Sequence, residues 1–271
     1  MQEFLNQPAV QSGVAPFIVA LIAAELFQRV RLSGLAIIAG FTTTVYLVDG
    51  FDFEPLTASR KIVLLGLAST VFAVAISFFY APWLRTLLAA VGAGASLWMA
   101  QRILELQPTP VGLMWSAACM FYTGWLVFWM DDLQDAPLRA GSAGMALGMG
   151  TGMAALFGAS ALLGTFGLSV GAAAAAYLLV QVITNHRLPC GRSFTLPLAL
   201  VSGLTACLGV LTTQLPWYAL IALGIVPLAA RIQIPEKSGL WLQSLLLSAA
   251  TMISAAVSVY LTWRVAGAPP L

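Results

Sequence analysis

The sequence predicts an all-α integral membrane protein, a polytopic helical bundle of about ten transmembrane helices. Of its 271 residues, 60% are hydrophobic and only 8% are charged, whereas a soluble domain carries about 25% charged residues. The mean hydropathy is +0.93. Most apolar runs have about the 20 residues that a helix needs to cross the hydrocarbon core of a bilayer. The alternating pattern of transmembrane β-strands is not visible.

Charged residues, prolines and glycines separate the apolar runs. The ninth run is the weakest, because its 15 residues would reach only ~22 Å as a helix and include Pro227. The short intervals between runs leave no room for a soluble domain, so residues 1–271 are expected to form a single transmembrane domain. In chain order the expected spans are 13–29, 33–49, 61–80, 83–101, 110–130, 140–163, 166–185, 194–213, 216–230 and 239–263.

Lysine and arginine residues are distributed unevenly between alternate loops, and this bias predicts the orientation. The richer set is expected to be cytoplasmic, which places both termini on the non-cytoplasmic side. The compact chain without targeting or glycosylation features favours a bacterial inner (plasma) membrane. The richer set contains Arg29, Arg31, Arg85, Arg139, Arg187, Arg192, Arg231 and Lys237, and the poorer set contains Arg60, Lys61, Arg102 and Arg264.

Glycine residues recur at intervals of four in the sixth span. Gly144, Gly148 and Gly152 therefore share one helix face. Small residues let membrane helices approach closely, where no hydrophobic effect drives them together. The seventh span is also rich in small residues, with Gly171 followed by five alanines. We expect these two helices to form the tightly packed centre, and a sliding surface in a transporter is the functional alternative.

Two acidic groups follow predicted spans. The spacing Asp131, Asp132 and Asp135 suits Mg²⁺ with a diphosphate, because hard oxygen ligands suit that ion. Three spans separate this group from the second one, so the two are expected on opposite membrane faces and cannot share a metal pair. The alternative is a solvated acidic loop with Arg139 as a nearby partner. The second group consists of Asp49, Asp52 and Glu54.

The sequence argues against two kinds of site, a serine nucleophile with a histidine base and a zinc site. The first lacks the right position of its residues and the second lacks enough ligands. Ser160 lies among small residues, but His186, the one histidine, is expected at the other end of the seventh span. A serine nucleophile needs a base within about 3 Å. His186 and Cys190 are too few ligands for zinc, and Cys119, Cys190 and Cys207 are scattered, so they predict no disulfide framework.

Glu25 is the most membrane-embedded acidic residue. Arg29 follows four residues later, so an interfacial ion pair is one interpretation, and a proton or cation site is the other. Polar residues in three further spans mark a candidate pathway, although threonine hydroxyls can also bond to their own helix. Its members are Thr42, Thr43, Thr44 and Tyr46 in the second span, Tyr122 and Thr123 in the fifth, and Gln181 in the seventh.

Three classes of function remain open. The first is a small permease-like transporter for an uncharged or weakly polar compound. The second is a non-catalytic membrane subunit or assembly factor, and the third is a lipid-processing enzyme that uses the Asp131 loop. Ten spans allow a five-plus-five inverted repeat, as in many transporters, and this repeat is a hypothesis from the helix number alone. We expect lipid and other membrane subunits as partners, no cofactor and, without a basic stripe, no nucleic acid.

Overall fold

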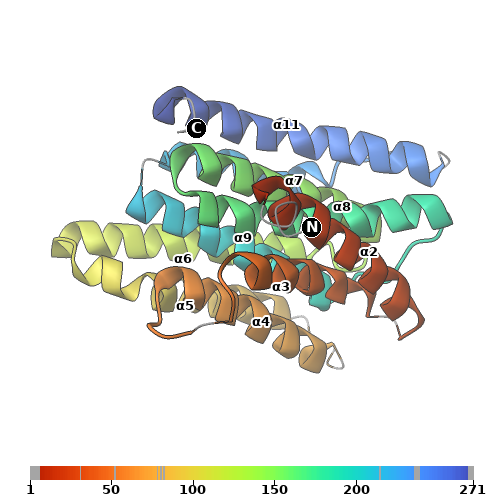
Figure 1. The fold of residues 1–271 in the computed structure, drawn as a ribbon, viewed down its shortest axis with the longest axis horizontal. Helices are drawn as coiled ribbons and strands as arrows, with labels where there is room; N and C mark the ends of the chain where they lie inside the picture. The colour runs from red at the N-terminus through yellow and green to blue at the C-terminus, as the bar shows by residue number, and fades with distance from the viewer. Residues whose placement is uncertain are drawn as a thin grey trace.

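The computed structural model describes residues 7–30, 32–51, 53–77, 79, 81, 83–213, 215–234 and 239–267, and these residues form an all-helical bundle (Figure 1). Helix α11 lies along one edge of the bundle, and α4 and α5 lie along the opposite edge. The helices are α2 (Ala15–Phe27), α3 (Ala36–Val48), α4 (Ala58–Ile76), α5 (Leu84–Glu105), α6 (Thr109–Asp131), α7 (Pro137–Gly158), α8 (Ala161–Thr184), α9 (Arg192–Thr212), α10 (Trp217–Ala229) and α11 (Leu240–Ala266).

Each predicted apolar run coincides with one of these helices. Eight helical segments are long and apolar enough to cross a membrane, the first of them Val10–Phe27, in which the π-helical turn η1 (Val10–Val14) leads into α2. The other two are shorter: Ser33–Val48, which joins the 3₁₀ turn η3 (Ser33–Leu35) to α3, and α10. The chain is therefore a membrane-embedded helical protein, as its composition predicts. Arg31, Asp52 and Lys237 lie outside the described residues.

Side chains beside the helices set several helix boundaries. The Thr57 hydroxyl accepts a hydrogen bond from the Arg60 backbone N–H at the start of α4. Ser160 accepts one from the Leu163 N–H at 3.2 Å and caps α8 in the same way. Asn185 adopts the left-handed conformation that commonly ends a helix, and it terminates α8.

Glycine residues bring the backbones of α7 and α8 into direct contact. A Cβ atom added to Gly148 would overlap the backbone nitrogen of Gly171, and one added to Gly167 would overlap that of Gly152. Gly144 faces Ala174 of α8 and also Leu198 of α9. All three glycines of the predicted stripe therefore lie where neighbouring helices leave no space for a side chain.

Helix α9, rather than α7 or α8, is the most buried helix. In its most apolar stretch 89% of the residues are buried, against 72% in α7 and in α8. It runs through the middle of the bundle between α4, α6 and α7 (Figure 1). The sixth and seventh spans therefore pack as tightly as predicted, and α9 belongs to the centre of the bundle with them. Small and hydroxyl side chains, Ser202, Gly203 and Thr205 among them, let the neighbouring helices approach α9.

We predict that Gly148→Ala lowers the free energy of unfolding by about 1–3 kcal/mol, the usual cost of overpacking a closed contact. Gly94→Ala in α5 is the matched control, because a Cβ atom there meets nothing within 4 Å. That change is expected to be neutral or to stabilise the helix by about 0.5–1 kcal/mol. Thermal unfolding of both variants in the same detergent compares them, and a Gly148→Ala protein that melts no lower than the wild type would contradict the contact.

Candidate functional site

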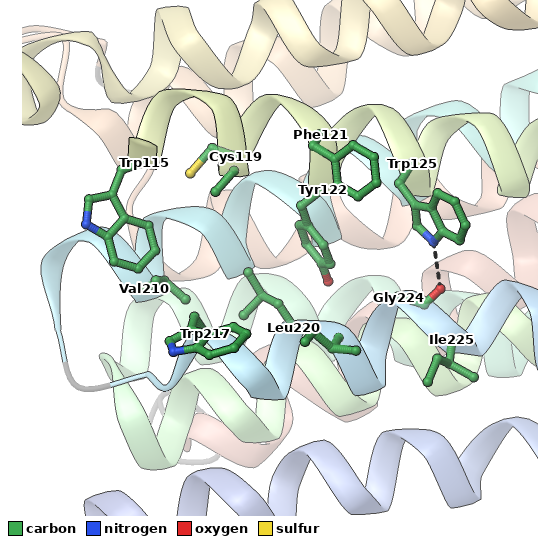
Figure 2. A pocket seen from close by; sticks show the side chains of 12 residues that line it. Trp115, Cys119, Phe121, Tyr122, Trp125, Val210, Trp217, Leu220, Gly224 and Ile225 are labelled. Carbon is green, nitrogen blue, oxygen red and sulfur yellow. Dashed lines mark hydrogen bonds between the residues drawn. The ribbon is translucent and has the colours of Figure 1, made fainter. Parts of the chain in front are cut away.

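An apolar groove of about 370 Å³ lies between α6 and α10, and we call it the α6–α10 groove. Figure 2 shows the twelve residues that line it, which come from these two helices and from Val210 of α9. Aromatic rings dominate its walls, and none of the lining residues carries a formal charge. The lining includes Trp115, Phe121, Tyr122, Trp125, Trp217 and Gly224.

Helical spacing explains the α6 wall. Trp115, Tyr122 and Trp125 are separated by seven and three residues, so they share one face of the helix. On α10 the corresponding face carries Gly224, which has no side chain and leaves room opposite the rings. The Trp125 indole donates a hydrogen bond to the Gly224 carbonyl oxygen at 2.9 Å, which joins the two walls at one point (Figure 2).

Tyr122 provides an unsatisfied polar group in the wall of the groove. The residue is only 8% exposed, and its hydroxyl has no hydrogen-bond partner among the described residues. Figure 2 shows that this hydroxyl points from α6 toward α10. An unmet buried donor costs about 1–3 kcal/mol, and a ligand with a suitable polar atom would remove that cost if a movement of α10 opened the hydroxyl to the groove.

The polar atoms behind the groove already have partners. The Thr123 hydroxyl lies 3.6 Å from the Cys207 sulfur, and the Cys207 thiol donates to the Cys119 carbonyl oxygen at 3.8 Å. Cys119, Cys190 and Cys207 are all free and buried. Within the described residues, no group of three or more histidine, cysteine or acidic side chains could hold a metal ion.

The Asp131 loop forms a second polar feature, a charge cluster at the end of α6. Asp131 accepts from Arg192 at 3.0 Å, and both residues are buried. Asp132 binds Arg85 at 2.6 Å and Arg231 at 3.1 Å. These pairs connect the end of α6 to the starts of α5 and α9 and to the residues after α10.

The prediction that Arg139 is the partner of these acidic residues was wrong, because the helix ends that meet here bring other arginines to them. Arg139 instead lies in α7 beside a separate pocket that Arg187 also lines. Because guanidinium groups hold the Asp131 and Asp132 carboxylates and Asp135 is exposed, Mg²⁺ binding would first have to displace arginine. This arrangement does not favour the lipid-processing enzyme.

The proposed ion pair between Glu25 and Arg29 is absent from the described residues. Both side chains are exposed, and Glu25 accepts from the Gln28 amide at 2.7 Å instead. Helix α2 ends at Phe27 and continues as the 3₁₀ turn η2 (Gln28–Val30), so the i,i+4 geometry of an α-helix is lost.

The other candidate pathway residues are spread through the bundle. The half-buried Thr43 bonds back to the Ala39 carbonyl oxygen, and Tyr46 is 68% exposed on the surface. Gln181 is fully buried, and neither of its amide atoms has a partner among the described residues. The α6–α10 groove contains Tyr122 from the fifth span but none of these three.

Ser160 and His186 lie at opposite ends of α8. The helix has 24 residues, which corresponds to about 36 Å at 1.5 Å per residue. A catalytic pair between them is therefore excluded by distance. His186 is exposed whereas Cys190 is buried, and burial raises the pKa of the Cys190 thiol well above its ordinary value. A thiol that stays protonated is a poor zinc ligand.

The α10 side of the groove was missed from the sequence. Trp217, Ile221 and Gly224 follow an i, i+4, i+7 spacing that places them on one helix face. This spacing was visible, but nothing in the sequence shows that α10 lies beside α6.

The chain matches no protein-family model, and no curated protein or solved structure is significantly similar to it.

We predict that Asp131→Asn lowers the free energy of unfolding by about 3–5 kcal/mol, because it leaves the buried Arg192 charge without its partner. Asp135→Asn makes the same chemical change at an exposed position and should alter stability by less than about 0.5 kcal/mol. Denaturant titration of the purified variants measures the difference. Equal losses in the two variants would argue against a stabilising role for the buried pair.

Proposed function

We propose that the chain is a small permease-like transporter for an uncharged or weakly polar compound, which reaches the protein from the bilayer through the α6–α10 groove. The observation that supports this most is the groove itself, an apolar space with one unpartnered hydroxyl, that of Tyr122. Its rim includes Phe121 and Ile221, which are 72% and 55% exposed. In a membrane protein such apolar surfaces face lipid.

The lining supports an uncharged substrate. A charged group in an apolar site is strongly unfavourable unless it is paired, and the groove offers no counter-charge. Its volume of about 370 Å³ lies in the range of small-molecule sites, about 300–1,000 Å³. A compound with a flat apolar body and one weakly polar group fits these properties.

Helix α10 is the element that we propose moves during transport. It has only 13 residues, or about 20 Å at 1.5 Å per residue, and Pro227 lies inside it. Proline cannot donate the helical hydrogen bond to the carbonyl four residues earlier, that of Leu223, and this weakens the helix there. A short, locally weakened helix beside the groove is a suitable gate.

We further propose that all ten helical segments cross a bacterial inner membrane, with both termini on the non-cytoplasmic side. The excess of arginine and lysine in one set of loops supports this orientation. Two packing contacts of the first half recur in the second half and support the inverted repeat. The contact of α2 with α3 corresponds to that of α7 with α8, and the contact of α5 with α6 corresponds to that of α10 with α11. The extensive packing of α11 along α7 has no comparable equivalent between α6 and α2 in the described residues.

A membrane subunit is the second candidate function. Only 28% of the most apolar stretch of α11 is buried, and an apolar groove of about 630 Å³ separates parts of α11 from α7. A partner helix could cover this side of the bundle. Co-purification from native membranes without a crosslinker tests this role, and a stoichiometric partner would favour it over a transporter that acts alone.

We predict that proteoliposomes loaded with a panel of uncharged aromatic alcohols, ketones, esters and amides release at least one compound faster than protein-free vesicles. Ile221→Trp should abolish the difference, because the larger indole fills the groove from its rim. Val71→Trp is the matched control, since Val71 is 73% exposed and belongs to α4 rather than to the groove.

Mass spectrometry of the external medium follows all compounds at once. Release that is the same from the wild type, Ile221→Trp and protein-free vesicles for every compound would overturn transport of this substrate class.

A further inference from the structure

We infer that the α6–α10 groove recognises an aromatic compound whose polar group is a hydrogen-bond acceptor of the carbonyl type. The inference rests on the proposed function, because it specifies the compound that the groove takes from the bilayer. Three features of the groove support it: the unpartnered hydroxyl of Tyr122, the chemistry of the other polar side chains, and the arrangement of the rings.

The Tyr122 hydroxyl is the first feature. It is buried in the wall of an apolar space, it points toward α10 (Figure 2), and no described residue accepts its proton. Buried N–H and O–H donors without an acceptor are rare in proteins. The oxygen is closed off from the open space of the groove, so a ligand carbonyl would reach it once α10 moves away from α6, and would then accept the hydrogen bond that the protein leaves unmade.

The second feature is the set of polar side chains around the groove. Trp115 and Trp217 are indoles, which can donate but cannot accept a hydrogen bond. No carboxylate or side-chain amide lines the groove, and the Gly224 carbonyl oxygen already accepts from Trp125 at 2.9 Å. Because the exposed lining is otherwise almost entirely apolar, the Tyr122 hydroxyl is the group that a polar ligand atom would meet, and it can donate to a ketone, quinone or ester.

The third feature is the arrangement of aromatic rings. Phe121 and Trp125 stack with their centroids 5.9 Å apart and their planes inclined by 29°. The bond from Trp125 to Gly224 fixes this indole before any ligand binds, so little freedom is lost on binding. Flat π surfaces favour flat partners in offset-stacked or edge-to-face contact. An aromatic or conjugated ring is therefore the expected body of the ligand.

Two probes that differ in one group test the inference. They are 4-decylbenzophenone and 4-decyldiphenylmethane, in which a methylene replaces the carbonyl. Affinities are measured with the tritiated ketone bound to the full-length protein in lipid nanodiscs, with the hydrocarbon as an unlabelled competitor. The wild type should bind the ketone about five- to tenfold more tightly, as expected for one buried hydrogen bond of about 1–1.4 kcal/mol.

Tyr122→Phe removes the hydroxyl and keeps the ring. In this variant the ketone should bind about five- to tenfold more weakly than in the wild type, while the hydrocarbon binds as before. Tyr46→Phe is the matched control, because Tyr46 lies exposed on α3 and outside the groove. It should leave both affinities unchanged. Because the lost hydroxyl has no partner, Tyr122→Phe is expected to melt no lower than the wild type.

Irradiation of the bound benzophenone maps the site, because its carbonyl inserts into nearby C–H bonds. Crosslinks to α6 or α10, found by mass spectrometry and lost in Ile221→Trp, would support the inference. Equal affinity of the wild type for the two probes would overturn acceptor recognition, although release of other uncharged compounds could still support transport. Crosslinks only to other helices, or no binding of either probe, would also overturn it. Tight, Tyr122-dependent binding without any release from proteoliposomes would instead overturn the transport proposal alone.

Discussion

The backbone contact between α7 and α8 is the constraint on which the rest of the bundle depends. Lipid chains are as apolar as leucine side chains, so membrane helices gain little by hiding apolar surface from lipid and associate by close packing instead. At Gly148 and Gly171 the two backbones leave no space even for a methyl group. Because α9 packs beside this pair and is itself almost fully buried, the centre is filled by protein. Space for a ligand is found instead at the flank, between α6 and α10.

Ion pairs fix the helices around that filled centre. Asp131 and Asp132 stand at the end of α6, and three arginines from other parts of the chain converge on them. Breaking a buried pair leaves an uncompensated charge and is strongly destabilising, even where the intact pair adds little net stability. The charge cluster therefore fixes the starts of α5 and α9 and the residues after α10 in position relative to the end of α6.

The amino-acid sequence predicted the helical membrane architecture, the position of each apolar segment and the glycine stripe, because hydrocarbon imposes length and composition on each helix separately. It did not predict the partners of Asp131 and Asp132 or the α10 wall of the groove. Those features depend on which helices become neighbours, and helices of nearly uniform apolar character carry little information about that. Tyr122 was recognised as polar within a span, but only the structure shows its hydroxyl unpartnered and facing α10.

Among the described residues, no hydrogen bond or ion pair joins the N-terminal halves of α6 and α10 across the groove. Trp125 of α6 donates to Gly224 at the middle of α10, and seven residues after each of them Asp132 pairs with Arg231. The two helices therefore run side by side in the same direction. Trp115 and Trp217, which both lie near the N-terminal ends of these helices, have no such link across the groove among the described contacts. The N-terminal halves of α6 and α10 can therefore separate while the rest of the two helices stays joined. We expect lipid-soluble molecules to pass between them from the one leaflet of the bilayer that contains these N-terminal halves.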